Sequence, residues 1–179
     1  MLNRFREHLL LGAALALVAA PLLPADAAAQ DGSRFQVMVA NLQPTDDSSE
    51  RWGRGAADEI RDLLDFDRHV AMSERDADDA ARQFDMRFRD MECIEVRQLA
   101  DAVNVPLVMC GTYEEQADGQ FRVEASFWTV PGQEELTVDP VYVENSRSGR
   151  VEAAQGIMQG FEALTERLLY MEWCQDSFL

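Results

Sequence analysis

The stretch that decides the fold is Leu99-Ala-Asp-Ala-Val-Asn-Val-Pro-Leu-Val-Met-Cys-Gly-Thr-Tyr113. Its first half ends a helix that we expect over about 91–103, because apolar residues recur there at helical spacing and Pro106 cannot continue a helix. Its second half, from Leu107 onward, is an almost unbroken apolar run, which is typical of a central strand in a sheet. The stretch therefore predicts a helix that leads directly into a buried strand.

Strands and helices also alternate before this stretch. Phe35, Val37 and Val39 recur at every second position, which is the period of a strand. Capping residues at Asp47–Glu50 and at Ser73 each precede a run with helical character. The predicted elements are, in order, a strand over 35–40, a helix over 52–64, a strand over 69–72, a short acidic helix near 74–84 and a charged connector over 85–90.

Three strands and a long helix make up the rest of the pattern. Asp118-Gly119 is a tight-turn signal, so the strands on either side of it must run antiparallel. Pro140 favours an edge position for the last strand. The predicted order is β-α-β-α-α-β-β-β-α, a mixed α/β fold with a sheet of about five strands and helices packed on it. The elements after the central strand are strands over 121–130 and 136–143 and a helix that Ser148-Gly149 opens.

The first 29 residues have the three-part pattern of a secretory signal peptide. Arg4 and Arg6 form a basic region, Leu9–Val18 is apolar apart from one glycine, and Ala27–Ala29 offers small side chains to a signal peptidase. The apolar run is too short to span ~30 Å of hydrocarbon, and no later apolar segment is long enough. We therefore expect cleavage near Ala29 and a periplasmic or secreted protein.

The composition limits the partners that the protein can have. Its 179 residues carry 16 basic side chains, all of them arginine, and 33 acidic ones, for a net charge of −17. Such a surface repels polyanions, which excludes a general nucleic-acid binder and disfavours anionic membranes. The length and the 47% of hydrophobic residues are typical of one globular domain. We expect that domain over residues 30–179, with its core in 34–170.

The residues that usually carry chemistry are scarce. After cleavage His69 is the one remaining histidine, so zinc sites built from two or three histidines lack ligands, and the three cysteines show no CxxC spacing. Asp76, Asp78 and Asp79 lack the central glycine and terminal glutamate of a calcium loop. We therefore predict no catalytic residue, no metal, no cofactor and no enzyme. A hydrolase built on Ser, Asp or Glu is the enzymatic alternative.

Four stretches share their pattern of apolar positions with known envelope proteins. They are Phe35–Leu42, Gly55–Leu64, Leu99–Tyr113, and Phe121–Val130 with the turn Pro131-Gly132 after it. In this order they resemble, over residues 34–170, the periplasmic α/β domain at the amino terminus of TolB and its relatives in the FlgO and CsgG groups. The resemblance implies a non-enzymatic protein that binds other envelope components, with no catalytic residue to carry over. The chain departs from TolB in lacking a propeller repeat, and from CsgG in lacking a lipidated cysteine and long membrane-inserting hairpins.

Export and this resemblance together predict a binding or assembly module of the bacterial cell envelope that acts through contacts with another envelope protein. The alternative is the amino-terminal docking domain of a longer envelope protein, such as one that continues into helical repeats. Trp173–Leu179 bears on the choice, because an apolar, cysteine-bearing segment is unusual at a chain end. Either the segment packs back on the domain, or it leads into a further part of a longer chain.

Aromatic and arginine side chains on the later strands are the candidates for partner binding, since such residues are enriched at interface centres. Alternation over 121–128 places the two phenylalanines on one strand face and Arg122 and Trp128 on the other. A tryptophan there is either a core contact at the strand end, which we favour, or part of an exposed patch. Tyr113 and Tyr142 are candidates for the same side as Arg122 and Trp128, although the register between strands cannot be read from the sequence.

A disulfide is expected because exported thiols are normally paired. Cys93 lies about 15 Å along its helix from Val103. Cys110 lies about 13 Å along its strand from Pro106. Both cysteines thus lie at a similar distance from the turn that joins the helix to the strand, which predicts a bond between Cys93 and Cys110. A bond that involves Cys174, or three unpaired thiols, are the alternatives, because the Cα atoms of a disulfide must approach within ~7 Å.

Overall fold

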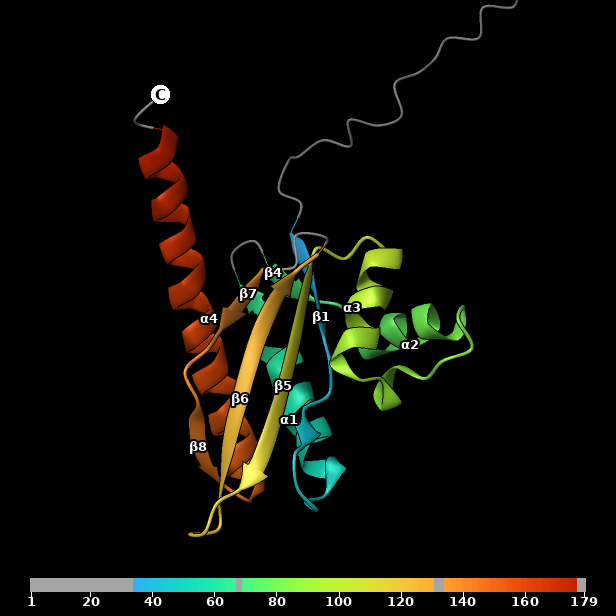
Figure 1. Cartoon of the computed structure of the whole chain (residues 1–179), viewed down its shortest axis with the longest axis vertical. Helices are drawn as coiled ribbons and strands as arrows, with labels where there is room; N and C mark the ends of the chain where they lie inside the picture. The colour runs from blue at the N-terminus through green and yellow to red at the C-terminus, as the bar shows by residue number, and fades with distance from the viewer. Residues whose placement is uncertain (1–33, 67–68, 131–133, 177–179) are drawn as a thin grey trace, which may run out of the picture. The chain divides into compact units, whose positions relative to one another are not determined.

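The computed structural model describes residues 34–66, 69–130 and 134–176 (Figure 1). The predicted signal peptide over 1–29 and its cleavage site lie outside these ranges. Within them, no helix combines the length and the apolar character that crossing a membrane requires.

The centre of the sheet is parallel and its far side is antiparallel. β1 (Phe35–Val39) runs parallel to β4 (His69–Ala71) on one side and to β5 (Leu107–Glu115) on the other. β6 (Gln120–Thr129) pairs antiparallel with β5 along its whole length. The remaining strands of the eight-stranded sheet are short: β2 (Gln43–Pro44), β3 (Asp65–Phe66), β7 (Glu135–Thr137) and β8 (Val141–Glu144).

The predicted mixed α/β class is confirmed, and the strand count is higher than expected for local reasons. β2 and β3 are two-residue pairings that leave too little pattern to detect. The single strand expected over 136–143 is wrong, because it is divided into β7 and β8, both of which pair with β6. The break falls at Val138–Pro140, where proline has no N–H to give to a ladder.

Serine side chains fix where the first two helices begin. Ser49 Oγ accepts a hydrogen bond from the Arg51 N–H at 3.4 Å, so Ser49 is the cap of the first helix. The sequence pattern alone indicates Asp47 for this position. Ser73 Oγ accepts from the Asp76 N–H at 3.1 Å, as expected from the sequence. The helical elements are α1 (Glu50–Leu63), α2 (Glu74–Arg82), the 3₁₀ turn η1 (Phe88–Asp90), α3 (Cys93–Ala102) and α4 (Arg147–Asp176).

The helices cover the two faces of the sheet unequally. α1 and α4 bury one face from β1 to β8, in a core that includes Ile60, Phe127 and Phe161. α2, η1 and α3 bury the other face through Met38, Val108 and their neighbours on β1 and β5. Figure 1 shows α2 and α3 beside β1 and β5, on the side away from α4. That second core ends at Trp128, which packs at its margin.

Two glycines allow α1 and α4, the helices on the first face, to lie close to neighbouring backbone. A Cβ on Gly53 of α1 would lie 2.0 Å from the Leu42 carbonyl oxygen, and one on Gly149 of α4 would lie 1.9 Å from that of Glu144. Glycine inside a helix costs up to about 1 kcal/mol relative to alanine. At these positions it lets each helix approach the backbone that precedes it.

Candidate functional site

Beyond the margin at Trp128, the second face of the sheet carries polar side chains, and none of the helices that the structure describes covers it. Directly opposed residues of an antiparallel pair share a face, and the ladder aligns Glu114 with Arg122 and Arg122 with Tyr142. The same rule adds Thr112 opposite Glu124 and Thr137 opposite Ser126. We call this surface the open face: Thr112, Glu114, Arg122, Glu124, Ser126, Thr137 and Tyr142.

Arg122 organises the centre of the open face. Its guanidinium pairs with Glu114 at 3.4 Å and, at shorter range, with Glu124. The hydrogen bond to Tyr142, followed by the charges of the neighbouring carboxylates, raises the pKa of Arg122 above its ordinary value. Because such exposed pairs contribute little to stability, the arrangement fixes the positions of side chains more than it stabilises the fold.

Exposed apolar side chains border this network. Tyr142 is 57% exposed and lies on the open face itself. Ile94 of α3 is 53% exposed and lies one helical turn before Arg97, on the same flank of the helix. The Arg97 guanidinium carbon is 3.9 Å from the centre of the Trp128 ring, so this flank lies against β6. The open face therefore has a sheet as its floor and α3 along one border.

The position of Trp128 agrees with the first of its two interpretations from the sequence, a core contact at the strand end. The ring is partly buried and packs against the core under α3, while Arg97 covers it from above. It is thus a core contact at the edge of the open face and not an exposed residue of it.

The inclusion of Tyr113 among the partner-binding candidates is wrong. Tyr113 pairs with Val123, which places its ring on the opposite, helix-covered face, where it is 1% exposed. There the centre of its ring lies 5.0 Å from the centre of the Trp52 ring, and its hydroxyl donates to the Ser49 carbonyl at 2.7 Å. Burial raises the pKa of Tyr113. The register that decides its side depends on pairing between distant strands, which the sequence alone does not display.

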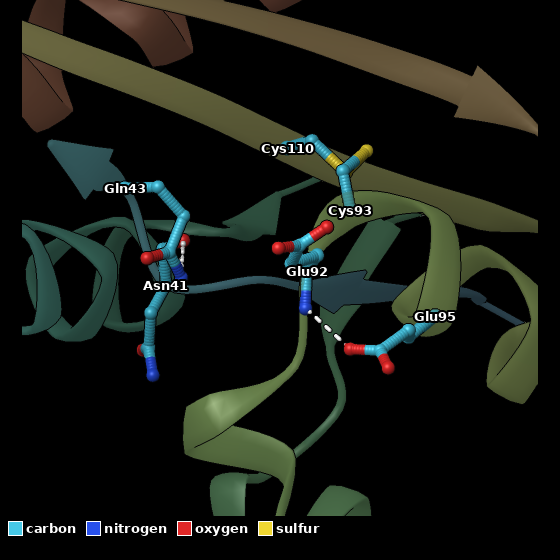
Figure 2. Close-up of a disulfide and its surroundings, with 6 residues drawn as sticks. All are labelled: Asn41, Gln43, Glu92, Cys93, Glu95 and Cys110. Carbon is cyan, nitrogen blue, oxygen red and sulfur yellow. Dashed lines mark hydrogen bonds between the residues drawn. A yellow bond between two sulfur atoms is a disulfide. The ribbon is translucent and has the colours of Figure 1, made fainter. Parts of the chain in front are cut away.

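The disulfide ties α3 to the sheet beside the open face. Cys93 is the first residue of α3, and its bond to Cys110 of β5 brings the two Cα atoms within 5.7 Å (Figure 2). The same helix end is held by a capping box in which the Glu92 N–H donates to Glu95 Oε2 at 2.8 Å. Two local constraints therefore fix the start of the helix that borders the open face.

A second polar cluster, which the sequence reasoning missed, lies at the carboxyl end of β1. α/β sheets usually bind ligands at such strand ends, where the connections depart to opposite faces. Here Arg61 of α1 donates to the Val39 carbonyl at 2.8 Å and to Asn41 Oδ1 at 3.2 Å, and Asn41 donates to the Arg89 carbonyl at 3.2 Å. Burial lowers the pKa of Arg61, against the opposing effect of Asp58.

This cluster fills the strand ends with the protein's own side chains. Asn41 is 5% exposed, and a polar residue directly after a buried strand was the signal that could have revealed it. In the part of the chain that the structure describes, no group of three or more His, Cys, Asp or Glu residues is placed to hold a metal ion.

Comparisons with known proteins concern the fold. No family model matches the chain, and no curated protein matches it. A lipoprotein from Neisseria meningitidis is similar in structure, with a TM-score of 0.52 at 11% identity, over 75% of this chain and 96% of that one. The LpoB C-terminal domain from Escherichia coli has a TM-score of 0.49 at 12% identity, over 66% of this chain and 88% of that one. The chain thus shares its fold with a solved bacterial lipoprotein.

Proposed function

We propose that this chain is an exported, non-enzymatic interaction module of the bacterial cell envelope, and that the open face contacts its protein partner. The observation that carries the proposal is the half-covered sheet: one face lies under α1 and α4, whereas α2 and α3 stop at Trp128 on the other. The fold shared with a Neisseria meningitidis lipoprotein supports an envelope location. The resemblance to the TolB, FlgO and CsgG domains supports the same role.

The open face has the composition of a protein contact surface. Tyr142 on the open face and Ile94 on the bordering helix α3 offer exposed apolar area, and Arg122 is held between two carboxylates in the middle. Interfaces typically place aromatic and arginine side chains in a central cluster with a polar rim. Tyr142 is therefore the proposed anchor, with Arg122 as its positioned neighbour and Trp128 as support from the edge.

Site-specific photo-crosslinking tests this proposal in cells that export the protein. A photoreactive amino acid at position 142 should give a defined covalent adduct with one envelope protein. The matched control is the same amino acid at Gln155, which is exposed on α4, the helix that covers the opposite face.

Adducts at both positions, or at neither, would contradict the assignment of the open face. A second variant separates binding from folding. Tyr142→Ala should abolish the adduct obtained from a photoreactive residue at Ser126, while the thermal midpoint stays within about 2 °C, because exposed substitutions change stability little. A large drop in the midpoint would instead show a structural role for Tyr142.

A further inference from the structure

A small cavity of about 230 Å³ lies where α2 ends and η1 begins, apart from the open face. Its lining holds three of the chain's arginines together with one carboxylate and one apolar side chain: Asp78, Arg82, Met86, Arg87 and Arg89. In a chain with a net charge of −17, this lining gathers guanidinium groups at one place.

The backbone that carries these arginines is anchored at several points. The turn that follows α2 contains Asp85, whose φ of 59° lets the Met86 N–H donate back to the Ala81 carbonyl at 3.1 Å. Phe88 is 2% exposed and anchors η1 in the core. The Arg89 carbonyl accepts from the buried Asn41 side chain at 3.2 Å. Arg87 and Arg89 therefore flank a fixed residue, and the cavity does not depend on a loose loop.

The charges of the lining are only partly neutralised. Arg82 pairs with Asp79 at 2.6 Å and Asp78 at 3.5 Å, which orients its guanidinium. Among the residues that the structure describes, Arg89 pairs only with its exposed neighbour Asp90, at 3.4 Å. Arg87 forms no ion pair with any residue whose side chain the structure describes. Those residues are 34–65, 69–130 and 134–165. The three aspartates of these ion pairs thus offset the charges of Arg82 and Arg89, and among these described residues the Arg87 guanidinium is the lining cation that the ion pairs leave unbalanced.

We propose that this cavity binds a phosphate group. Guanidinium groups present paired N–H donors that match the oxygens of an oxyanion, and a phosphate offers three acceptor oxygens to the three arginines where a carboxylate offers two. Charges farther away than about 8 Å are largely screened at physiological ionic strength, so the balance depends on the near groups, among which Asp79 and Asp90 are already paired with arginines. Met86 provides an apolar wall against which the carrier of the phosphate can lie.

The first test is a titration of the purified protein with inorganic phosphate, followed by the arginine side-chain N–H signals in NMR. We expect saturable shifts of the Arg87 and Arg89 signals, and an affinity that falls about tenfold or more in Arg87→Gln, as the loss of a hydrogen bond to a charged group implies. The matched control is Arg75→Gln, because Arg75 lies on α2 with a side chain 90% exposed and outside the lining.

Acetate and chloride at equal ionic strength separate phosphate recognition from a general effect of anions. Equal saturable shifts with acetate, or an unchanged affinity in Arg87→Gln, would overturn the proposal. Co-sedimentation with vesicles that contain phosphatidic acid distinguishes a lipid headgroup from soluble phosphate as the source. Binding that requires Arg87 in either arm supports the phosphate site, and absence of such binding in both arms refutes it.

Discussion

Reduction of the disulfide between Cys93 and Cys110 should lower the free energy of unfolding by about 3 kcal/mol. The two cysteines are 17 residues apart in sequence, and closing a loop of that length removes about this much chain entropy from the unfolded state. For a domain of this size, the same loss corresponds to a fall of about 6–12 °C in the thermal midpoint.

The measurement is best made in a Cys174→Ser background, in which no third thiol is available for exchange. Urea unfolding followed by tryptophan fluorescence is compared with and without a phosphine reductant. The reduced protein should unfold at a lower midpoint and with a steeper dependence on urea, because its unfolded chain exposes more surface.

Two results would refute the reasoning. Identical midpoints for the oxidised and reduced protein would show that the bond does not constrain the unfolded chain. Alkylation of both Cys93 and Cys110 in the native chain before any reduction would show that the bond is absent. A double Cys93→Ala and Cys110→Ala variant should reproduce the reduced protein, apart from the small volume lost at the buried Cys110.

Three further outcomes are expected. Gly53→Ala should lower the free energy of unfolding by at least about 2 kcal/mol, because the new Cβ meets the Leu42 carbonyl. In Gly55→Ala the new Cβ meets the movable Arg150 side chain, so the loss should be much smaller. The urea midpoints of the two variants check this difference. Burial raises the folded-state pKa of Tyr113 above its ordinary value of 10.0. The stability that Tyr113 contributes is therefore complete below that value and is lost as the pH rises through the folded-state pKa. Between about pH 8 and about pH 11, the Tyr113→Phe variant should lose less stability than the unmodified protein. Mass spectrometry of the protein purified from its native host should find the amino terminus near residue 30, and an intact first methionine would contradict export with cleavage.

Much of the fold could be read from local sequence. Ser73 and Pro106 mark a helix start and a helix end through interactions that reach only a few residues. The alternation over 121–128 placed Phe127 in the core and Arg122 on the other face, because successive side chains of any strand point to opposite sides. Cap, turn and period are properties of neighbouring residues, so these elements and the mixed α/β class were predictable.

The candidate sites depend on contacts between distant parts of the chain. Tyr113 and Tyr142 were equivalent candidates in the sequence, and only the pairing of β5 and β8 with β6 buried one and exposed the other. A shift of one residue in a strand's register turns every side chain to the other face, so no local pattern reveals it. The same holds for Gly53, which reads as a weak helix position until the approach to Leu42 is known.

The sequence by itself therefore determined the acidic character of the chain and the order of its longer elements, and it predicts export. The tertiary structure alone decided where the helices stop covering the sheet, which sets the open face beyond Trp128. It also brought Arg82, Arg87 and Arg89 to one cavity, through the turn at the end of α2 and the anchor at Phe88. The physical reason is one of range: propensity and periodicity act over a few residues, whereas coverage, register and the meeting of charges follow from how the whole core packs.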